Sequence, residues 1–348
     1  MEICFVNQDM SLGGSSTVLY EIIKNWPNKK DSLSLIVFYD LFDERYLDLF
    51  NLSYLKIYIL NKTKTIDFKF LKVLKKTIFD IKPNVISSHL TCVFYLRLVG
   101  AAKICNIYHT IHSEPINDLP KIYRLLIKRY IKKDKIKLIG CCDYVTKKAI
   151  QLYNHECLTI RNGIDLSCKH PRTESNQLRF LFVGRLCEVK NVVEIVESFN
   201  NVDGDFVLNI CGSGSEEYTK LVTQTISDNK NSDKIHLFGN QQDIEAIYSK
   251  SDILILVSKR EGMPMVLFEG AKYGLGFITT DVGSISEVVT PNINGYFVKD
   301  FSELTDKLNL LIFNKELVND FKKNSLKICS NFGASVMAKK YYEVLKNG

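Results

Sequence analysis

The sequence contains no apolar stretch near the roughly 18 consecutive residues that a membrane-spanning helix requires. Its 348 residues include one tryptophan, seven prolines and ten cysteines. No two cysteines form a CxxC pair or stand at a zinc-binding spacing with histidine. The first residues, MEICFVNQDM, have an acidic side chain at position 2 and a short apolar run, which predicts a buried strand rather than a signal peptide. These absences exclude a transmembrane protein and a disulfide-stabilised secreted domain, and they predict reduced cysteines in a cytoplasmic protein.

What is present is the composition of a globular protein. Apolar residues make up 46% of the chain and charged residues 24%. The chain is longer than one comfortable core, so the length predicts two domains of about 150 residues each.

Short β-rich runs alternate with helix-length segments along the whole chain. Near-continuous apolar strands separated by helices are typical of parallel sheets covered on both faces. The expected strands are residues 3–7, 33–38, 55–60, 84–87, 104–111, 136–140 and 157–160, followed by 178–184, 206–212, 234–239, 252–257, 276–280 and 295–299. The fold class is therefore predicted to be α/β, with two Rossmann-like, doubly wound domains.

The predicted domains are residues 1–165 and 178–330. Residues 165–177 between them have no apolar period and contain a proline, so they are expected to be a linker. Two such domains create a cleft, and ligands of open α/β sheets bind at the carboxyl ends of the strands. The final segment, residues 331–348, has a helical pattern.

The net charge of +7 is unevenly spread. Residues 121–137, KIYRLLIKRYIKKDKIK, carry eight basic side chains and one acidic one. At helical spacing the basic residues Lys121, Arg124, Lys128 and Lys132 share one side, and Ile122, Leu125, Leu126 and Tyr130 share the other. This basic amphipathic helix is either an ordinary surface helix or one that docks on anionic lipid. Nucleic acid is disfavoured, because no aromatic platform or helix-turn-helix spacing accompanies the charge.

Two strand ends carry groups suited to phosphate. LGGSSTVLYEI, residues 12–22, places Gly13 and Gly14 between the first strand and a helix, where backbone N–H groups could approach a phosphate; the alternative is a plain loop without GxGxxG spacing. FVGRLCEVKN, residues 182–191, places Arg185 and Lys190 at a strand-to-helix junction. Two cations there can bind a diphosphate, although they could also be solvated surface charges.

The glycine-serine loop NICGSGSEE, residues 209–217, could approach a nucleotide through Gly212 and Gly214. KREGMPMVLFEGAKYG, residues 259–274, then places one glutamate in a strand exit and a second in the helix that follows. An ionised Glu261 near that helix start only accepts hydrogen bonds, so a pair of neighbouring sugar hydroxyls is its natural partner. The alternative is a capping carboxylate plus a surface Glu269.

These stretches do not stand alone. RNGID, GRLCEVKN, GSGS, HLFGNQQDIEAIYSKSDILILVSKREGMPMVLFEGAKYG, TTDVGSISEVV and NGYFV occur in this order between about residues 162 and 298. In order and spacing the set resembles the retaining GT-B glycosyltransferases of the group 1, or glycosyltransferase family 4-like, family. Over the first domain the resemblance rests on Gly13-Gly14 and on TIHSE, residues 110–114.

The resemblance implies a donor site for a nucleoside-diphosphate sugar in the second domain and an acceptor site in the first. It implies Arg185 and Lys190 on the diphosphate, Glu261 on sugar hydroxyls, and Glu269 on the ribose. His112 resembles the family histidine beside the anomeric carbon, with His109 as the rival. The implied catalytic residues are Glu261, His112, Arg185 and Lys190, and the implied donor-binding residues are Gly14, Gly212, Gly214, Met263, Pro264, Met265, Val266 and Glu269.

The resemblance also implies the reaction: transfer of a hexose or N-acetylhexosamine, most commonly from a UDP-sugar, to a hydroxyl of a glycan or lipid-linked glycan in cell-surface polysaccharide biosynthesis. No metal or other cofactor is expected, and Asp-Gly-Asp at residues 203–205 precedes a strand, which indicates a turn. The final helix is expected to pack back across the domain boundary, at a location that is cytoplasmic or peripheral on the inner membrane face. Two alternatives remain: a nucleotide-sugar epimerase or hydrolase, and a non-catalytic nucleotide-sugar-binding protein.

Overall fold

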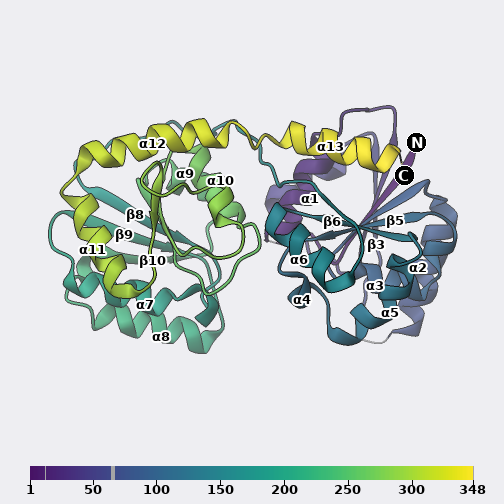
Figure 1. Cartoon of the computed structure of the whole chain (residues 1–348), viewed down its shortest axis with the longest axis horizontal. Coiled ribbons are helices and arrows are strands. Elements are labelled where there is room, and N and C mark those ends of the chain that lie inside the picture. The colour runs from purple at the N-terminus through teal and green to yellow at the C-terminus, as the bar shows by residue number, and fades with distance from the viewer. Residues whose placement is uncertain (12, 64–66, 348) are drawn as a thin grey trace. The chain divides into compact units, whose positions relative to one another are not determined.

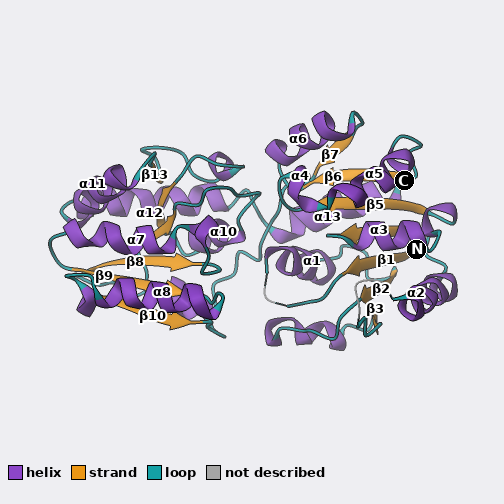
Figure 2. Cartoon of the chain, turned by 90° about the horizontal axis from the view of Figure 1, so that it is seen from below, coloured by secondary structure: helices purple, strands orange, loops and turns teal. Residues whose placement is uncertain are grey.

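The computed structural model describes residues 1–11, 13–63 and 67–347 (Figure 1). The chain divides into two compact units. The first unit comprises Met1–Asp165 and the segment that begins at Gly333, and the second comprises Leu166–Phe332. In each unit a sheet lies between helices (Figures 1 and 2).

The sheet of the first unit is parallel throughout its described strands, in the order β3-β2-β1-β4-β5-β6-β7. Its inner strands are buried almost without a break, as their apolar sequences predict, whereas the two edge strands, β3 and β7, are only partly buried. The strands are β1 Glu2–Asn7, β2 Ser32–Val37, β3 Leu55–Ile59, β4 Val85–His89, β5 Asn106–Ile111, β6 Ile136–Gly140 and β7 Cys157–Thr159.

The helices of the first unit come from both ends of the chain. They are α1 Gly14–Lys24, α2 Phe68–Ile81, α3 Cys92–Leu98, α4 Pro115–Asp118, α5 Lys121–Ile131, α6 Asp143–Tyr153 and α13 Ala334–Lys346, with 3₁₀ turns at Glu44–Asn51 and Ala101–Lys103. Helix α13 packs on α1 and β4. The buried hydroxyl of Tyr341 lies 3.1 Å from Thr110 Oγ1, and the ring of Tyr342 meets Trp26 edge-on.

The sheet of the second unit is also parallel throughout its described strands, in the order β10-β9-β8-β11-β12-β13. Its core is rich in phenylalanine, with Phe180, Phe199 and Phe206 in mutual ring contact. The strands are β8 Leu178–Val183, β9 Phe206–Cys211, β10 Ile235–Gly239, β11 Ile253–Leu256, β12 Gly276–Thr279 and β13 Gly295–Phe297. The helices are α7 Val192–Ser198, α8 Glu216–Ser227, α9 Ile244–Tyr248, α10 Met265–Lys272, α11 Phe301–Ile312 and α12 Lys315–Cys329, and the 3₁₀ turns are Glu188–Lys190, Phe199–Asn201, Ser232–Lys234 and Ile285–Glu287.

The predicted fold class, α/β with two Rossmann-like doubly wound sheets, is confirmed. In both sheets the first strand has the second strand on one side and the fourth on the other, so the order reverses beside it. Every strand expected from the sequence is present, and all ten cysteines are free thiols. Among the described residues, every helix is too short or too polar to cross a bilayer.

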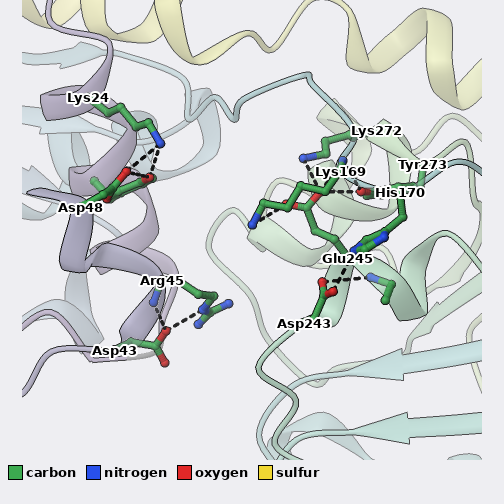
Figure 3. Close-up of polar contacts among 12 residues, drawn as sticks. Lys24, Asp43, Arg45, Asp48, Lys169, His170, Asp243, Glu245, Lys272 and Tyr273 are labelled. Carbon is green, nitrogen blue, oxygen red and sulfur yellow. Dashed lines mark hydrogen bonds and ion pairs between the residues drawn. The ribbon is translucent and has the colours of Figure 1, made fainter.

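The prediction that residues 165–177 form a linker is wrong for most of that segment, which is bonded to the second unit. His170 Nε2 lies 2.7 Å from Asp243 Oδ2, and Lys169 pairs with Glu245 (Figure 3). Arg172 donates to Asp252 at 2.8 Å. These contacts are polar, which is why the segment lacks the apolar period by which packed elements are recognised. In the first unit, ion pairs of the same kind, such as Lys24 with Asp48, join α1 to the 3₁₀ turn (Figure 3).

Asp252, just before β11, forms ion pairs with three cationic side chains. Arg179 and Arg172 donate to its carboxylate at 2.9 and 2.8 Å, and Lys322 of α12 lies 2.6 Å away. Burial alone would raise the pKa of Asp252, but the hydrogen bonds from Arg179 and Lys322 hold it below its ordinary value. The cluster therefore ties the start of the second unit to its last helix.

The basic segment also differs from the prediction. Helix α5 ends at Ile131, and β6 begins at Ile136, so residues 121–137 are not one helix. The side chains that α5 buries are Ile127 and Ile131. The apolar side predicted from the sequence, Ile122, Leu125, Leu126 and Tyr130, is instead largely exposed.

Candidate functional site

The loops that leave β8 and β11 start at the topological switch point of the second sheet. Strand β8 lies between β9 and β11. The chain continues from β8 to β9 on one side of the switch point and from β11 to β12 on the other. In open α/β sheets, ligands bind outside the carboxyl ends of the strands at this place. The predicted cations and the predicted Glu261 all lie on these two loops.

Lys190 and Glu261 meet there as an ion pair. Lys190 Nζ lies 2.5 Å from Glu261 Oε1, and the two side chains are 16% and 10% exposed. The two loops are also joined through their backbones, because Lys259 N–H donates to Val189 O at 2.8 Å and Asn191 Nδ2 donates to Val257 O at 2.7 Å. The sequence predicted that the helix start would keep Glu261 ionised, whereas the charged partner in the structure is Lys190.

Arg185 lies on the same loop as Lys190 and is exposed. It follows Gly184, and a Cβ placed on Gly184 would stand 3.9 Å from Lys190 Cε. The structure therefore places both predicted phosphate ligands just after β8, one paired and shielded and the other open to solvent.

The glycine-serine loop after β9 packs directly against the loop after β8. Gly212 has φ +136°, and a Cβ there would stand 1.8 Å from Gly184 O. Gly214 is similarly close to Leu186, whose N–H donates to Ser213 O at 2.9 Å. Both glycines are thus required by backbone contact, independently of any ligand.

Helix α10 begins at the same edge of the sheet. Pro264 is its N-cap. Among the described residues, no protein group accepts from the N–H of Met265 or Val266, as is normal for a first turn. The side chains of Met263 and Met265 are buried, so only their backbones can face a ligand.

Glu269 lies in the second turn of α10. Its Oε2 accepts a hydrogen bond from Tyr248 Oη at 2.8 Å. Its carboxylate is therefore oriented by a tyrosine of α9 and is only partly exposed.

In the first unit, His112 stands at the exit of β5 and contacts His89 at the end of β4. His89 Nδ1 lies 2.8 Å from His112 Nε2, and Ser87 Oγ lies 3.3 Å from His89 Nε2. Burial lowers the pKa of His112 to about 4, against a smaller raising effect of Asp118. Burial, with His112 and His109 nearby, lowers the pKa of His89 well below its ordinary value. Both rings are therefore neutral at neutral pH, and one donates to the other.

His109, the rival assignment, is fully buried within β5. Its Nε2 lies 3.0 Å from Asp118 Oδ2. Its Nδ1 has no hydrogen-bond partner in the part of the chain that the structure describes. Its environment is that of a core histidine.

Gly14 is the first residue of α1, with Gly13 as its extended N-cap. The switch point of the first sheet lies between β1 and β4, and there Gln8 Nε2 donates to Thr91 Oγ1 at 2.6 Å. The carboxyl ends of β1 and β4 are thus joined beside the glycine loop, whose residue 12 lies outside the described residues.

Sequence reasoning missed three polar side chains at these edges. His89 could have been noticed as a histidine at the end of an apolar strand. Asn191 and Ser258 lie on the two loops that carry Lys190 and Glu261, and each has a buried oxygen with no partner among the described residues. Short polar residues in loops give no periodic signal, so the sequence could not single them out. Among the described residues, no cluster of His, Cys, Asp or Glu could hold a metal ion.

Comparison with known proteins identifies the second unit. The family model described as "Glycosyl transferases group 1" matches residues 168–328, nearly the whole of that unit. The second unit is a group 1 glycosyl transferase domain. The predicted membership is thereby confirmed, and the two-sheet architecture is the GT-B fold.

Two curated relatives and one solved structure place this glycosyl transferase domain among similar proteins. An uncharacterised glycosyltransferase of Methanocaldococcus jannaschii is 25% identical over 63% of this chain and 62% of its own length. An undecaprenol-diphosphate-linked glycan α-1,4-N-acetyl-D-galactosaminyltransferase of Campylobacter jejuni is 26% identical over 99% of this chain and 98% of its own. The Anabaena HepE structure with UDP superposes with TM-score 0.84 over all of both chains at 16% identity, a likeness of fold.

Proposed function

We propose that the protein is a retaining glycosyltransferase that moves a hexose or N-acetylhexosamine from a UDP-sugar to a hydroxyl of a glycan or lipid-linked glycan. The observation that carries this proposal is the Lys190–Glu261 pair at the switch point of the second sheet, with Arg185 on the same loop as Lys190. The name of the Campylobacter relative, which acts on an undecaprenol-linked glycan, supports the acceptor class and a role in polysaccharide or glycolipid synthesis. The proposal places this synthesis at the inner membrane face. UDP in the Anabaena structure supports the nucleotide.

The ion pair has a role in this proposal. Without a donor, Glu261 neutralises Lys190 in a site shielded from solvent. A diphosphate brings two negative charges to the end of β8, where Lys190 and Arg185 bind it, and Glu261 becomes available to accept hydrogen bonds from the sugar. Glu269 and the first amides of α10 bind the ribose and the sugar.

Departure of UDP breaks the bond between the anomeric carbon and the phosphate oxygen and leaves oxocarbenium-like charge on the sugar. The acceptor hydroxyl attacks on the same face and gives its proton to the departing diphosphate. The two cations stabilise the diphosphate more strongly as it gains charge, which lowers the barrier. No metal takes part in this scheme. His112 and Gly14 belong to the first unit, and their contacts with sugar and phosphate stay predictions.

The first experiment measures donor binding. Calorimetry with UDP- and GDP-sugars should show UDP-sugar binding that weakens about ten- to a hundredfold in Arg185→Ala or Lys190→Ala, since each hydrogen bond to a charged group contributes roughly 1.5–3 kcal/mol. Lys220→Ala, an exposed lysine on α8, is the matched control and should bind normally. Equal affinity for UDP-sugar in all variants would contradict the assignment of Arg185 and Lys190 to the diphosphate.

The second experiment analyses products. With a UDP-sugar and a glycan acceptor, NMR of the product should show the donor's anomeric configuration, and EDTA should leave the rate unchanged. Rapid sugar release or epimerisation without acceptor would instead establish the hydrolase or epimerase alternative. Donor binding with no turnover under any acceptor would point to a binding protein.

A further inference from the structure

Helix α5 exposes apolar side chains that the fold does not use. Ile122 and Leu125 are each 61% exposed and Leu126 is 38% exposed. Ile116 of α4, 54% exposed, stands just before them, and Arg124 fixes this connection by donating to Ile116 O and to Leu119 O. Four large aliphatic side chains therefore face solvent within one short stretch.

The inner face of α5 is already fully packed. Ile127 and Ile131 are completely buried, and the Tyr123 ring stacks on Phe94 of α3 at a centroid distance of 3.6 Å. The guanidinium of Arg97 lies over the ring of Tyr130. These contacts attach α5 to α3 and β6, so the exposed residues add nothing to the core. An exposed apolar patch of this kind indicates an interaction site.

The exposed apolar residues are surrounded by positive charge. Lys121 at the start of α5 and Arg129, Lys132 and Lys133 at its end are all exposed. The single acidic residue of this stretch, Asp134, is paired with His155 at 2.9 Å. Within the part of the chain that the structure describes, Lys121, Arg129, Lys132 and Lys133 form no ion pair. A surface with aliphatic side chains beside such cations complements an anionic lipid bilayer, whose headgroups attract the cations while the acyl region accepts the side chains.

A neighbouring helix extends this surface. Ring contacts from Phe70 of α2 to Tyr95 of α3, and from Tyr95 to Tyr123 of α5, show that the three helices lie side by side (Figures 1 and 2). The outward side of α2 exposes Val73 and Phe79. It also exposes four lysines: Lys69, Lys72, Lys75 and Lys76.

We propose that α5, supported by α2, docks the first unit on an anionic lipid bilayer. Ile122, Leu125 and Leu126 enter the interface between headgroups and acyl chains, and Arg129, Lys132 and Lys133 contact the lipid phosphates. This inference concerns how the enzyme reaches its acceptor, and it does not depend on which sugar or nucleotide the proposed function involves.

Co-sedimentation with lipid vesicles tests the proposal. The full chain should bind vesicles that contain about 30% phosphatidylglycerol far better than pure phosphatidylcholine, and salt should weaken the binding. The affinity for anionic vesicles should fall about a hundredfold in the triple variant Arg129→Gln/Lys132→Gln/Lys133→Gln, at roughly fivefold per charge. It should fall at least about tenfold in Leu125→Ser/Leu126→Ser, because the aliphatic side chains that enter the bilayer are removed.

Matched controls separate docking from other effects. Leu221→Ser and Lys220→Gln change an exposed leucine and lysine on α8 of the second unit and should leave vesicle binding unaltered. Leu126→Trp should shift its emission to the blue on anionic vesicles, against the single native Trp26, which is buried. All variants should keep wild-type affinity for UDP-sugar, so a failure here is distinct from a failure of the proposed function.

Two results would overturn the proposal. One is equal binding of wild type and the triple variant to anionic vesicles. The other is a concentration-dependent dimer in lipid-free solution that Leu125→Ser/Leu126→Ser abolishes, which would make a second copy of the chain the partner of this face.

Discussion

Lys190 and Glu261 are each the other's counter-charge, so single and double substitutions should behave differently. Lys190→Met leaves a shielded carboxylate without its partner and should lower the free energy of unfolding by about 3 kcal/mol. Lys190→Met/Glu261→Gln removes both charges and should recover most of that stability. Neither variant should regain donor affinity, since a diphosphate needs the ammonium. Urea unfolding and calorimetry with UDP-sugar measure the two effects.

If the double variant bound UDP-sugar like the wild type, the pair would be a structural ion pair and nothing more. If the single variant unfolded like the wild type, the pair would contribute no stability. The two measurements therefore judge the structural and functional roles of the same contact separately.

The His89–His112 contact predicts a pH dependence of the first unit. The folded-state pKa of His112, about 4, lies below the ordinary value of 6.5, so protons bind the unfolded chain more tightly. Stability is then complete above pH 6.5 and falls as the pH drops toward 4, by roughly 3 kcal/mol at pH 4 from His112 alone. His89 acts in the same direction.

Trp26 is buried in the first unit, so its fluorescence reports urea unfolding of that unit alone. The free energy of unfolding at pH 7 and at pH 5 should differ less in His112→Gln than in the wild type, because the variant lacks one histidine whose pKa is lowered by folding. An identical difference in the two proteins would mean that His112 is not neutral in the folded state.

At the scale of elements, the loops after β8 and β9 depend on a glycine. Gly212→Ala would place a Cβ 1.8 Å from Gly184 O in a left-handed backbone, and should destabilise the second unit by several kcal/mol. Gly239→Ala, also at positive φ but with open space around it, should cost only about 1 kcal/mol. Thermal unfolding compares the two. Similar losses would show that backbone conformation, not contact, governs both positions.

The strands were predictable because burial on both faces makes a parallel strand nearly all apolar. LRFLFV, residues 178–183, carries that signal in one short run. The orientation of α5 was not predictable, since its apolar residues satisfy more than one helical stripe. The structure buries Ile127 and Ile131, and α3 places Phe94 and Tyr95 against Tyr123 of α5, a contact that the sequence of α5 does not contain.

The site was predictable residue by residue but not as an arrangement. Lys190 and Glu261 are 71 residues apart and meet because β11 pairs directly with β8, while β9 and β10 lie on the other side. Strand order is a property of the whole sheet, so local spacing could name the two residues without predicting that they pair. The His89–His112 contact likewise depends on β4 pairing with β5.

At the scale of the molecule, the first unit is discontinuous in sequence. The chain leaves it at Asp165, builds the second unit and returns at Gly333 to add α13. Ala334 N–H donates to Ile164 O at 2.8 Å, so the outgoing and returning segments are joined where they cross. The family resemblance predicts that the final helix packs back across the domain boundary; in the structure, α13 contributes Met337, Tyr341 and Leu345 to the core of the first unit.

Removal of residues 333–348 should therefore unfold the first unit and spare the second. Loss of three buried side chains, at roughly 1.5–3 kcal/mol each, amounts to most of the stability of an ordinary domain. Trp26, which loses its contact with Tyr342, should show red-shifted emission without urea. Thermal-shift assays with UDP should still detect binding, because the Lys190–Glu261 loops lie in the second unit.

Val336→Ser changes an exposed position of α13 and is the control, which should behave like the wild type. Native Trp26 emission in the truncated chain would refute the dependence of the first unit on α13.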